Sequence, residues 1–225
     1  MVSKNVLIVE SQNDKFFIEN LLKHINQIAI KVENPICSID DYECLEGLSL
    51  AKLKHKLTEI QTTIEKDDIQ KLGIIVDADK QGIDQRLGLV NQAISECGFD
   101  LAPLEFNHWL HCEKYDVDLS CHILSYDGVG ELETLLKAIK NQDSSFADCL
   151  NAWQFCLAGQ GKTISSKEFD KFWISIYQRY DCCSKEDKKQ ANRKCSFEAS
   201  MAKPIWDFEH AALNSLKDYL NTFTA

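Results

Sequence analysis

Two short apolar runs that end in carboxylates place the strongest constraint on the fold of this chain. Residues 6–9 read Val-Leu-Ile-Val and are followed at once by Glu10, and residues 72–76 read Leu-Gly-Ile-Ile-Val and are followed by Asp77 and Asp79. Apolar runs of this length are typical of strands that are buried on both faces of a sheet. A helical pattern follows each run, so the sequence predicts parallel strands that are joined by helices.

The rest of the chain continues this alternation and then becomes helical. Apolar residues recur at helical spacing over 13–25, 48–66 and 82–97, and short strand-like stretches lie at 28–39 and between 100 and 125. From residue 129 onward helical patterns dominate. We therefore predict an α/β fold with a mainly parallel, Rossmann-like sheet flanked by helices, with a core over 1–140 and a helical C-terminal extension over 141–225 packed on it.

Composition excludes several classes of protein. The 225 residues carry 25 basic and 35 acidic side chains, a net charge of −10, which argues against a general nucleic-acid coat protein. An acidic chain can still act on nucleic acid if metal ions and a local basic patch meet the phosphates. No apolar stretch approaches the ~18 residues that span a bilayer, and the first 30 residues lack a secretory core, so we expect a cytoplasmic protein without membrane association.

The ten cysteines are scattered along the chain and form no C-x-x-C pair. Because disulfides are rare in cytoplasmic proteins of this size, the sequence predicts that most of these cysteines are small buried hydrophobes.

The acids at the strand ends predict a site for a divalent cation. Carboxyl ends of neighbouring parallel strands meet at one edge of a sheet, which is where such folds bind ligands. The i, i+2 pair of Asp77 and Asp79 supplies the hard oxygen ligands that suit Mg²⁺ or Mn²⁺. Glu10 is expected to contribute to the same metal site without being fully committed to it, so it could also move a proton. Without a cation at least one of the three acids should have a raised pKa.

Two of these stretches resemble the motifs of the Toprim superfamily. VESQNDKFFIENLL, at 9–22, resembles the first motif, in which a strand ends in Glu and Asp follows four residues later. IIVDADKQG, at 74–82, resembles the second motif, a strand-end D-x-D. LSYDGVGELETLL, at 124–136, and the closing Lys203, Trp206, Asp207 and His210 are similar to small stand-alone Toprim-like proteins of unknown function related to the overcoming-lysogenization-defect nucleases.

The resemblance implies roles for individual residues. It assigns Glu10 as the general acid/base and Asp77 and Asp79 as the metal-binding pair, with Asp14 orienting Glu10 or the loop and Glu133 as a further acid near the metal. Ser11 departs from the Gly that most Toprim domains place after the Glu, so a close approach of phosphate to that backbone is not expected. The candidates for binding the phosphate backbone are Lys80, Lys203 and Arg193.

The implied activity is metal-assisted phosphoryl transfer on DNA or RNA. No tyrosine nucleophile is identifiable, so hydrolysis of phosphodiesters is expected rather than strand passage. Small Toprim-like proteins resemble the nuclease parts of ATPase–nuclease systems, which implies an ATPase partner by analogy only, and a homodimer is compatible with the pattern.

Two other classes remain open from the sequence. The first is a non-catalytic Toprim relative that binds nucleic acid or a partner without cutting it. The second is a receiver-like signalling domain, because VLIVES at 6–11 is similar to a first receiver strand and Asp77 ends a later strand. Receivers usually carry an acidic pair after the first strand, whereas here Glu10 is followed by Ser11 and Gln12.

Overall fold

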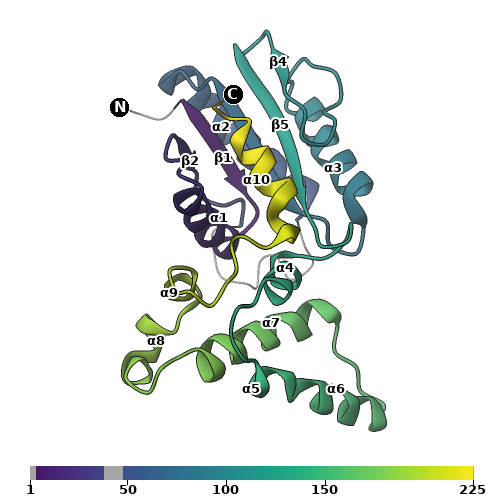
Figure 1. The fold of residues 1–225 in the computed structure, drawn as a ribbon. Coiled ribbons are helices and arrows are strands. Elements are labelled where there is room, and N and C mark those ends of the chain that lie inside the picture. Colours follow the sequence, from purple (N-terminus) through teal and green to yellow (C-terminus); the bar gives the residue numbers. More distant parts are fainter. Residues whose placement is uncertain (1–3, 38–47, 225) are drawn as a thin grey trace.

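The computed structural model describes residues 4–37 and 48–224, and within these ranges it forms one sheet of five strands flanked by helices (Figure 1). The strand order is β2-β1-β3-β5-β4. All neighbours pair in parallel except β4 and β5, which are antiparallel. This confirms the predicted mainly parallel α/β fold. The strands are β1 (Asn5–Val9), β2 (Ile30–Val32), β3 (Lys71–Asp77), β4 (Leu110–Cys112) and β5 (Val117–Leu124).

The strand register brings the carboxyl ends of β1 and β3 together. Val9 of β1 stands opposite Ile75 of β3, so Glu10 leaves the sheet beside the end of β3. Asp77 in turn stands opposite Leu124 of β5. The first apolar run therefore pairs directly with the second, and this pairing fixes where the acids meet.

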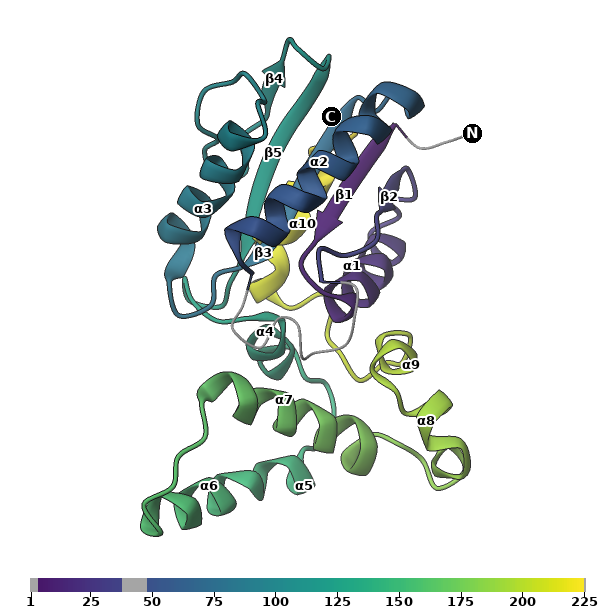
Figure 2. The same cartoon turned by 180° about the vertical axis from the view of Figure 1, so that it is seen from behind.

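Helices cover both faces of the sheet, as Figure 1 and the reverse view in Figure 2 show. Strand β1 illustrates the alternation, because Val6 and Ile8 belong to one core cluster and Leu7 and Val9 to the other. One face packs on α2 and α3, and the opposite face on α1 and α10. These helices are α1 (Gln12–His24), α2 (Leu50–Asp67), α3 (Gly82–Glu96) and α10 (Asn214–Asn221).

A helical segment lies beyond the carboxyl edge of the sheet, below it in Figure 1. Its helices are connected by short loops, and the chain then returns so that α10 covers the sheet. The proposed domain boundary at 140/141 stays a prediction. The elements are α4 (Leu132–Ala138), α5 (Ser145–Asp148), α6 (Leu150–Gly159), α7 (Ser166–Ile176), η1 (Tyr177–Asp181), η2 (Asp187–Gln190), α8 (Ala191–Lys194), α9 (Phe197–Met201) and η3 (Ala211–Leu213).

The expectation about cysteines is wrong in part. Cys183 and Cys195 form a disulfide, because the chain between η1 and α9 folds back and brings their Cα atoms to 5.8 Å. Cys112 and Cys121 are buried free thiols as expected, whereas Cys149 and Cys156 are exposed. None of the helices within 4–37 and 48–224 combines the length and the hydropathy that a bilayer-spanning helix requires.

Candidate functional site at the carboxyl edge of the sheet

Glu10 lies at the centre of the site, immediately after β1. Its side chain is almost fully buried, at 4 % exposure. Oε2 accepts a hydrogen bond from the backbone N–H of Asp77 at 3.3 Å and another from Arg86 Nη2 at 3.0 Å. The first of these bonds ties the end of β1 directly to the end of β3, as the strand register requires.

The D-x-D pair has two different environments. Asp77 ends β3 and is buried, and its Oδ1 has no hydrogen-bond partner. Asp79 stands in the left-handed region, with φ of 49°, a conformation that Asp tolerates better than most side chains. Its backbone N–H and C=O each form a 2.9 Å hydrogen bond with Gly130, which joins the D-x-D turn to the loop before α4. This pairing explains how the stretch 124–136, which we call the third motif, reaches the site.

Gly130 allows the third motif to enter the cluster of acids. Its φ is 92°, and a Cβ at this position would meet the Thr134 side chain at 3.1 Å, so a larger residue would be strained. Two residues earlier, Asp127 and Gly128 have φ of 54° and 84° and form a tight turn. Glu131 and Glu133 then follow at the start of α4 and are both buried, at 5 % and 6 % exposure.

Asp14 enters the site through the cap of α1. Ser11 is the N-cap residue of this helix. Ser11 Oγ accepts from the Asp14 N–H at 3.3 Å, and Asp14 Oδ2 accepts from the Ser11 N–H at 2.8 Å, which together form a capping box. Ser11 therefore has a structural role as the cap of α1. Asp14 Oδ1 is buried and has no hydrogen-bond partner.

Six carboxylates thus lie together, and we refer to them as the acidic cluster: Glu10, Asp14, Asp77, Asp79, Glu131 and Glu133.

Two cations partly neutralise the acidic cluster. Arg86 of α3, at 1 % exposure, places Nη2 at 3.0 Å from Glu10 and 3.1 Å from Asp79. Its Nε also donates to the backbone oxygen of Asp77 at 2.7 Å, which fixes the guanidinium across the site. Lys167, in the first turn of α7, donates to Asp79 Oδ1 at 2.9 Å and lies 3.9 Å from Glu131. Neither cation makes a hydrogen bond that satisfies the buried Oδ1 atoms of Asp14 and Asp77.

Burial and mutual repulsion raise the pKa of most of these acids. Burial raises the pKa of Asp77 well above its usual value, and the charges of Asp14 and Glu10 raise it further. Burial raises the pKa of Asp14 and of Glu131 to about 7. The pKa of Glu10 is also raised by burial, although Arg86 opposes the rise. Burial lowers the pKa of Lys167, but its hydrogen bond to Asp79 and the negative charges of Asp79, Glu131 and Asp77 together raise that pKa above its usual value and keep the ammonium charged.

The donor set fits a hard divalent cation, although it is not a closed cage. Across the described residues, no three His, Cys, Asp or Glu side chains form a ready metal-binding group. Glu10 and Asp79 are instead bridged by Arg86. Mg²⁺ needs only one or two carboxylates, because it keeps several waters and takes phosphate oxygens as its other ligands. The buried Oδ1 atoms of Asp14 and Asp77, which have no hydrogen-bond partner, are carboxylate oxygens that could act as these ligands.

The site therefore brings together five of the residues that the sequence singled out, namely Glu10, Asp14, Asp77, Asp79 and Glu133. The three basic candidates lie elsewhere or at its margin. Lys80 is exposed in the turn after Asp79. Lys203 forms an ion pair with Asp187 at 2.9 Å, and Arg193 is exposed on α8, so neither is held against the acidic cluster.

Sequence reasoning missed Arg86, Lys167 and Glu131. The burial of Arg86 could have been predicted from the sequence. It falls four residues before Val90 and eight before Ile94, so helical spacing places it on the buried face of α3. A cation on such a face needs a buried anionic partner. Glu131 lies inside the quoted third motif. Lys167 has no comparable signal, since it comes from a helix that is remote in sequence and only tertiary folding places it beside Asp79.

Comparisons with known proteins identify a family for the chain. Its sequence matches, over residues 4–225, the family described as "Protein of unknown function (DUF3226)". No curated protein matches the chain in sequence. Two solved structures are similar to the chain at a low level. The C-terminal region of the OLD protein of Xanthomonas campestris pv. campestris, phased with mercury, has 13 % sequence identity and a TM-score of 0.38, and the match covers 100 % of this chain and 98 % of that one. The C-terminal region of the Burkholderia pseudomallei OLD protein has 12 % identity and a TM-score of 0.36, and the match covers 100 % of both chains. Because the family match spans nearly the whole sequence, the chain belongs to the DUF3226 family.

Proposed function

We propose that this protein is a divalent-metal-dependent phosphoryl-transfer enzyme of the Toprim type that hydrolyses nucleic-acid phosphodiesters. One observation carries the proposal: acids from three separate segments lie together at the carboxyl edge of the sheet, all but Asp79 buried, with the Oδ1 atoms of Asp14 and Asp77 unsatisfied. Burying several uncompensated carboxylates is costly, so a fold that retains them has a use for a cation at that position.

The residues divide the chemistry between them. Asp77 and Asp14, with Asp79 and Glu133 beside them, would hold Mg²⁺ or Mn²⁺. When bound, such an ion supplies charge neutralisation for a phosphoryl group in the transition state. Glu10 is the proton carrier, because its raised pKa brings its exchange of protons closer to neutral pH.

Arg86 and Lys167 position the acids and supply positive charge beside them. Arg86 holds the Glu10 carboxylate in a fixed position through Oε2 and leaves Oε1 to exchange a proton with water or with a leaving oxygen. Lys167 keeps its charge beside Asp79, where it can balance the negative charge of a substrate phosphate.

Cleavage assays on wild type and Asp77→Asn test the proposal. Labelled single- and double-stranded DNA and RNA are incubated with Mn²⁺, and the matched control is Asp84→Asn, which changes an exposed acid in the first turn of α3. We expect Asp77→Asn to lose about 100-fold or more of the activity, because each ligand contributes to several kcal/mol of charge stabilisation, and the control to keep it.

Two results would overturn the assignment. Equal cleavage by wild type and Asp77→Asn would mean that a contaminating nuclease cuts the substrate. Absence of cleavage together with absence of Mn²⁺ binding by calorimetry would exclude a metal-dependent enzyme.

A non-catalytic nucleic-acid-binding relative is the second candidate, and one observation favours it. Arg86 Nη2 lies between Glu10 and Asp79 and already neutralises part of the site without a metal ion. For this candidate we expect wild type to bind nucleic acid in the presence of Mn²⁺ without cutting it. An ATPase partner and a homodimer remain further proposals, and a pull-down and a light-scattering mass would test them.

A further inference from the structure

A pocket of about 310 Å³ lies beside the acidic cluster, between α1, α4, α7–η1 and α9. Glu133 belongs both to this pocket and to the acidic cluster, and Asn13 of the pocket wall precedes Asp14. The pocket is therefore continuous with the proposed catalytic edge. The other lining residues that matter here are Lys171, Ile174, Ser175, Arg179 and Phe197.

The pocket carries two basic side chains, Lys171 and Arg179, whereas the neighbouring acidic cluster consists of carboxylates. Lys171, Ser175 and Arg179 follow one another at four-residue spacing along α7 and η1, so they present one face of this helix to the pocket. The last of them belongs to η1, a π-helical turn, and such turns recur at functional sites. Two cations next to a site that is proposed to hold a phosphate are placed to bind the neighbouring phosphate of the same strand.

The pocket also has an apolar wall. Ile174 is buried at 3 % exposure, and Phe197 is half-buried on the opposite helix α9. An aromatic ring beside cations is the combination with which proteins bind single-stranded nucleic acid. The volume is at the lower end of the range of about 300–1,000 Å³ for small-ligand pockets, so it admits one nucleotide rather than a stacked pair.

From these features we propose that the pocket receives one unpaired nucleotide of the substrate strand, with its phosphate on Lys171 and Arg179 and its base against Phe197. This inference rests on the proposed function and deepens it, because it names a single strand as the substrate at the point of cleavage. A duplex could not place one nucleotide here without unpairing it.

Binding of a fluorescent single-stranded DNA 12-mer, followed by anisotropy with Ca²⁺ and checked on gels for uncut strand, tests the pocket. For Lys171→Gln/Arg179→Gln we expect the Kd to rise about tenfold or more. The slope of log K against log salt should fall by about 1.4, since each phosphate contact on a single strand contributes about 0.7. A structural defect alone would not change this slope in proportion to the charges removed.

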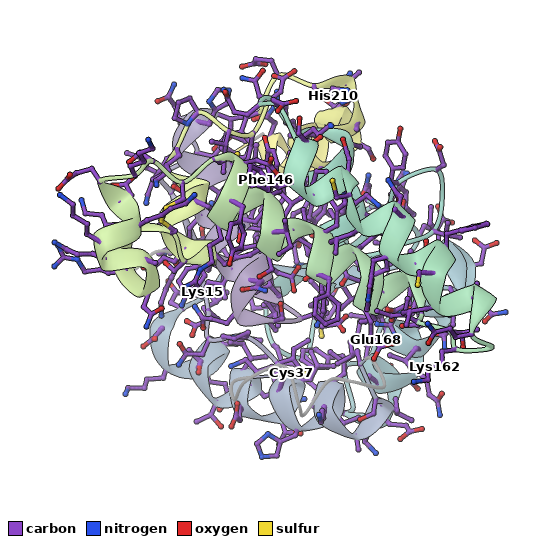
Figure 3. All side chains as sticks on the ribbon, turned by 90° about the horizontal axis from the view of Figure 1, so that it is seen from below. Lys15, Cys37, Phe146, Lys162, Glu168 and His210 are labelled. Carbon is purple, nitrogen blue, oxygen red and sulfur yellow. A yellow bond between two sulfur atoms is a disulfide. The ribbon has the colours of Figure 1, made fainter. Side chains whose placement is uncertain are left out.

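The matched control removes the same charge elsewhere. Lys66→Gln/Lys162→Gln changes two exposed lysines, and Figure 3 shows Lys162 at the tip of the α6–α7 connection, at the opposite end from α8 and α9. We expect the Kd of this control to stay within about twofold of wild type. Ser175→Glu, at an exposed helical position, adds a negative charge without removing packing and should also weaken binding.

The outcomes separate this inference from the proposed function. If the pocket variants bind the 12-mer as wild type does, or wild type binds duplex in preference to single strand, the pocket assignment is wrong even if Mn²⁺-dependent cleavage is found. If the pocket variants lose binding but wild type cuts nothing, the pocket stands and the nuclease assignment fails.

Discussion

A single buried carboxylate makes the stability of this protein depend on pH. Burial raises the pKa of Asp14 from 3.8 to about 7. Between these values the unfolded chain has lost its proton while the folded protein retains it, so the free energy of unfolding falls as the pH rises from about 4 to about 7.

Asp14→Asn should therefore stabilise the protein at pH 8 and have little effect at pH 4. Asn stays neutral, and its amide oxygen can still accept from the Ser11 N–H. One pKa unit is about 1.4 kcal/mol, so we expect a gain of the order of a few kcal/mol at pH 8 in urea unfolding. Asp84→Asn is the control. An equal effect of Asp14→Asn at both pH values would show that Asp14 is ionised throughout this range.

Arg86 offers a second test at the same scale. Arg86→Met removes the cation that is paired with Glu10 and Asp79 and leaves the buried Glu10 and the half-buried Asp79 without it. Breaking a buried pair in this way costs about 3–5 kcal/mol, which thermal unfolding at pH 7 would measure. Mn²⁺ should restore part of the loss, because it replaces the missing positive charge.

Arg193→Met, at an exposed position of α8, should change the Tm little with or without Mn²⁺. A full loss of stability that Mn²⁺ does not reduce would argue against a cation site between these acids.

The sequence predicts individual site residues only where a local pattern carries them. Glu10, Asp77 and Asp79 are predictable because they end apolar runs, and parallel pairing then brings the ends together. Arg86 is predictable in principle from the buried face of its helix. Lys167 is not, because its position beside Asp79 depends on how a remote helical segment packs, and no local pattern contains that information.

At the scale of elements, β3 packs closely against α10 and the residues that follow it. Gly73 of β3 has no room for a side chain, since a Cβ there would lie 2.5 Å from the Phe223 ring and 2.6 Å from the Tyr219 hydroxyl. The absence of a side chain at this position leaves room for the Tyr219 and Phe223 side chains against the strand.

Gly73→Ala should therefore destabilise the protein by about 1–3 kcal/mol, the usual cost of overpacking a core. The matched control is Gly88→Ala in α3, where a Cβ would meet no atom within 4 Å. That change should instead stabilise the protein by about 0.5–1 kcal/mol, because Ala favours helix and restricts the unfolded chain. Urea unfolding of both variants measures the difference, and equal effects of the two would contradict the packing of α10 on β3.

Elements with strong periodicity were predicted well, and connections between elements were not. The helices α2 and α3 lie within two residues of their predicted limits, because each has an apolar face over several turns. The strand predicted at 28–39 is only Ile30–Val32 in the structure, and Ile28 is 89 % exposed. Alternating residues alone did not reveal that this edge strand ends where its pairing with β1 ends.

At the scale of the whole molecule, metal binding should couple to folding. Apolar residues of β1, α7 and α10 belong to one core cluster, so an ion at the edge of the sheet stabilises a single packed unit. At 100 times its Kd, Mn²⁺ adds about 2.7 kcal/mol, or about 5–10 °C in Tm for a chain of this size.

The stabilisation by Mn²⁺, measured as the rise in Tm, should be larger at pH 8 than at pH 6. Asp14, whose pKa is raised to about 7, must lose its proton before it can bind a cation, and metal binding is favoured where that proton has already left. Scanning calorimetry with Mn²⁺ at both pH values measures the shift, with K⁺ at matched ionic strength as the control. A shift that does not change with pH would place the ion away from Asp14.

The return of α10 to the sheet has a consequence for biosynthesis. During synthesis the apolar face of β1 and β3 emerges long before Leu213, Leu216 and Tyr219, the residues that cover it. Until these residues leave the ribosome, that apolar face stays uncovered by them while the whole helical segment is translated. Chaperones that bind exposed apolar strands would therefore find their target in the growing polypeptide during this interval.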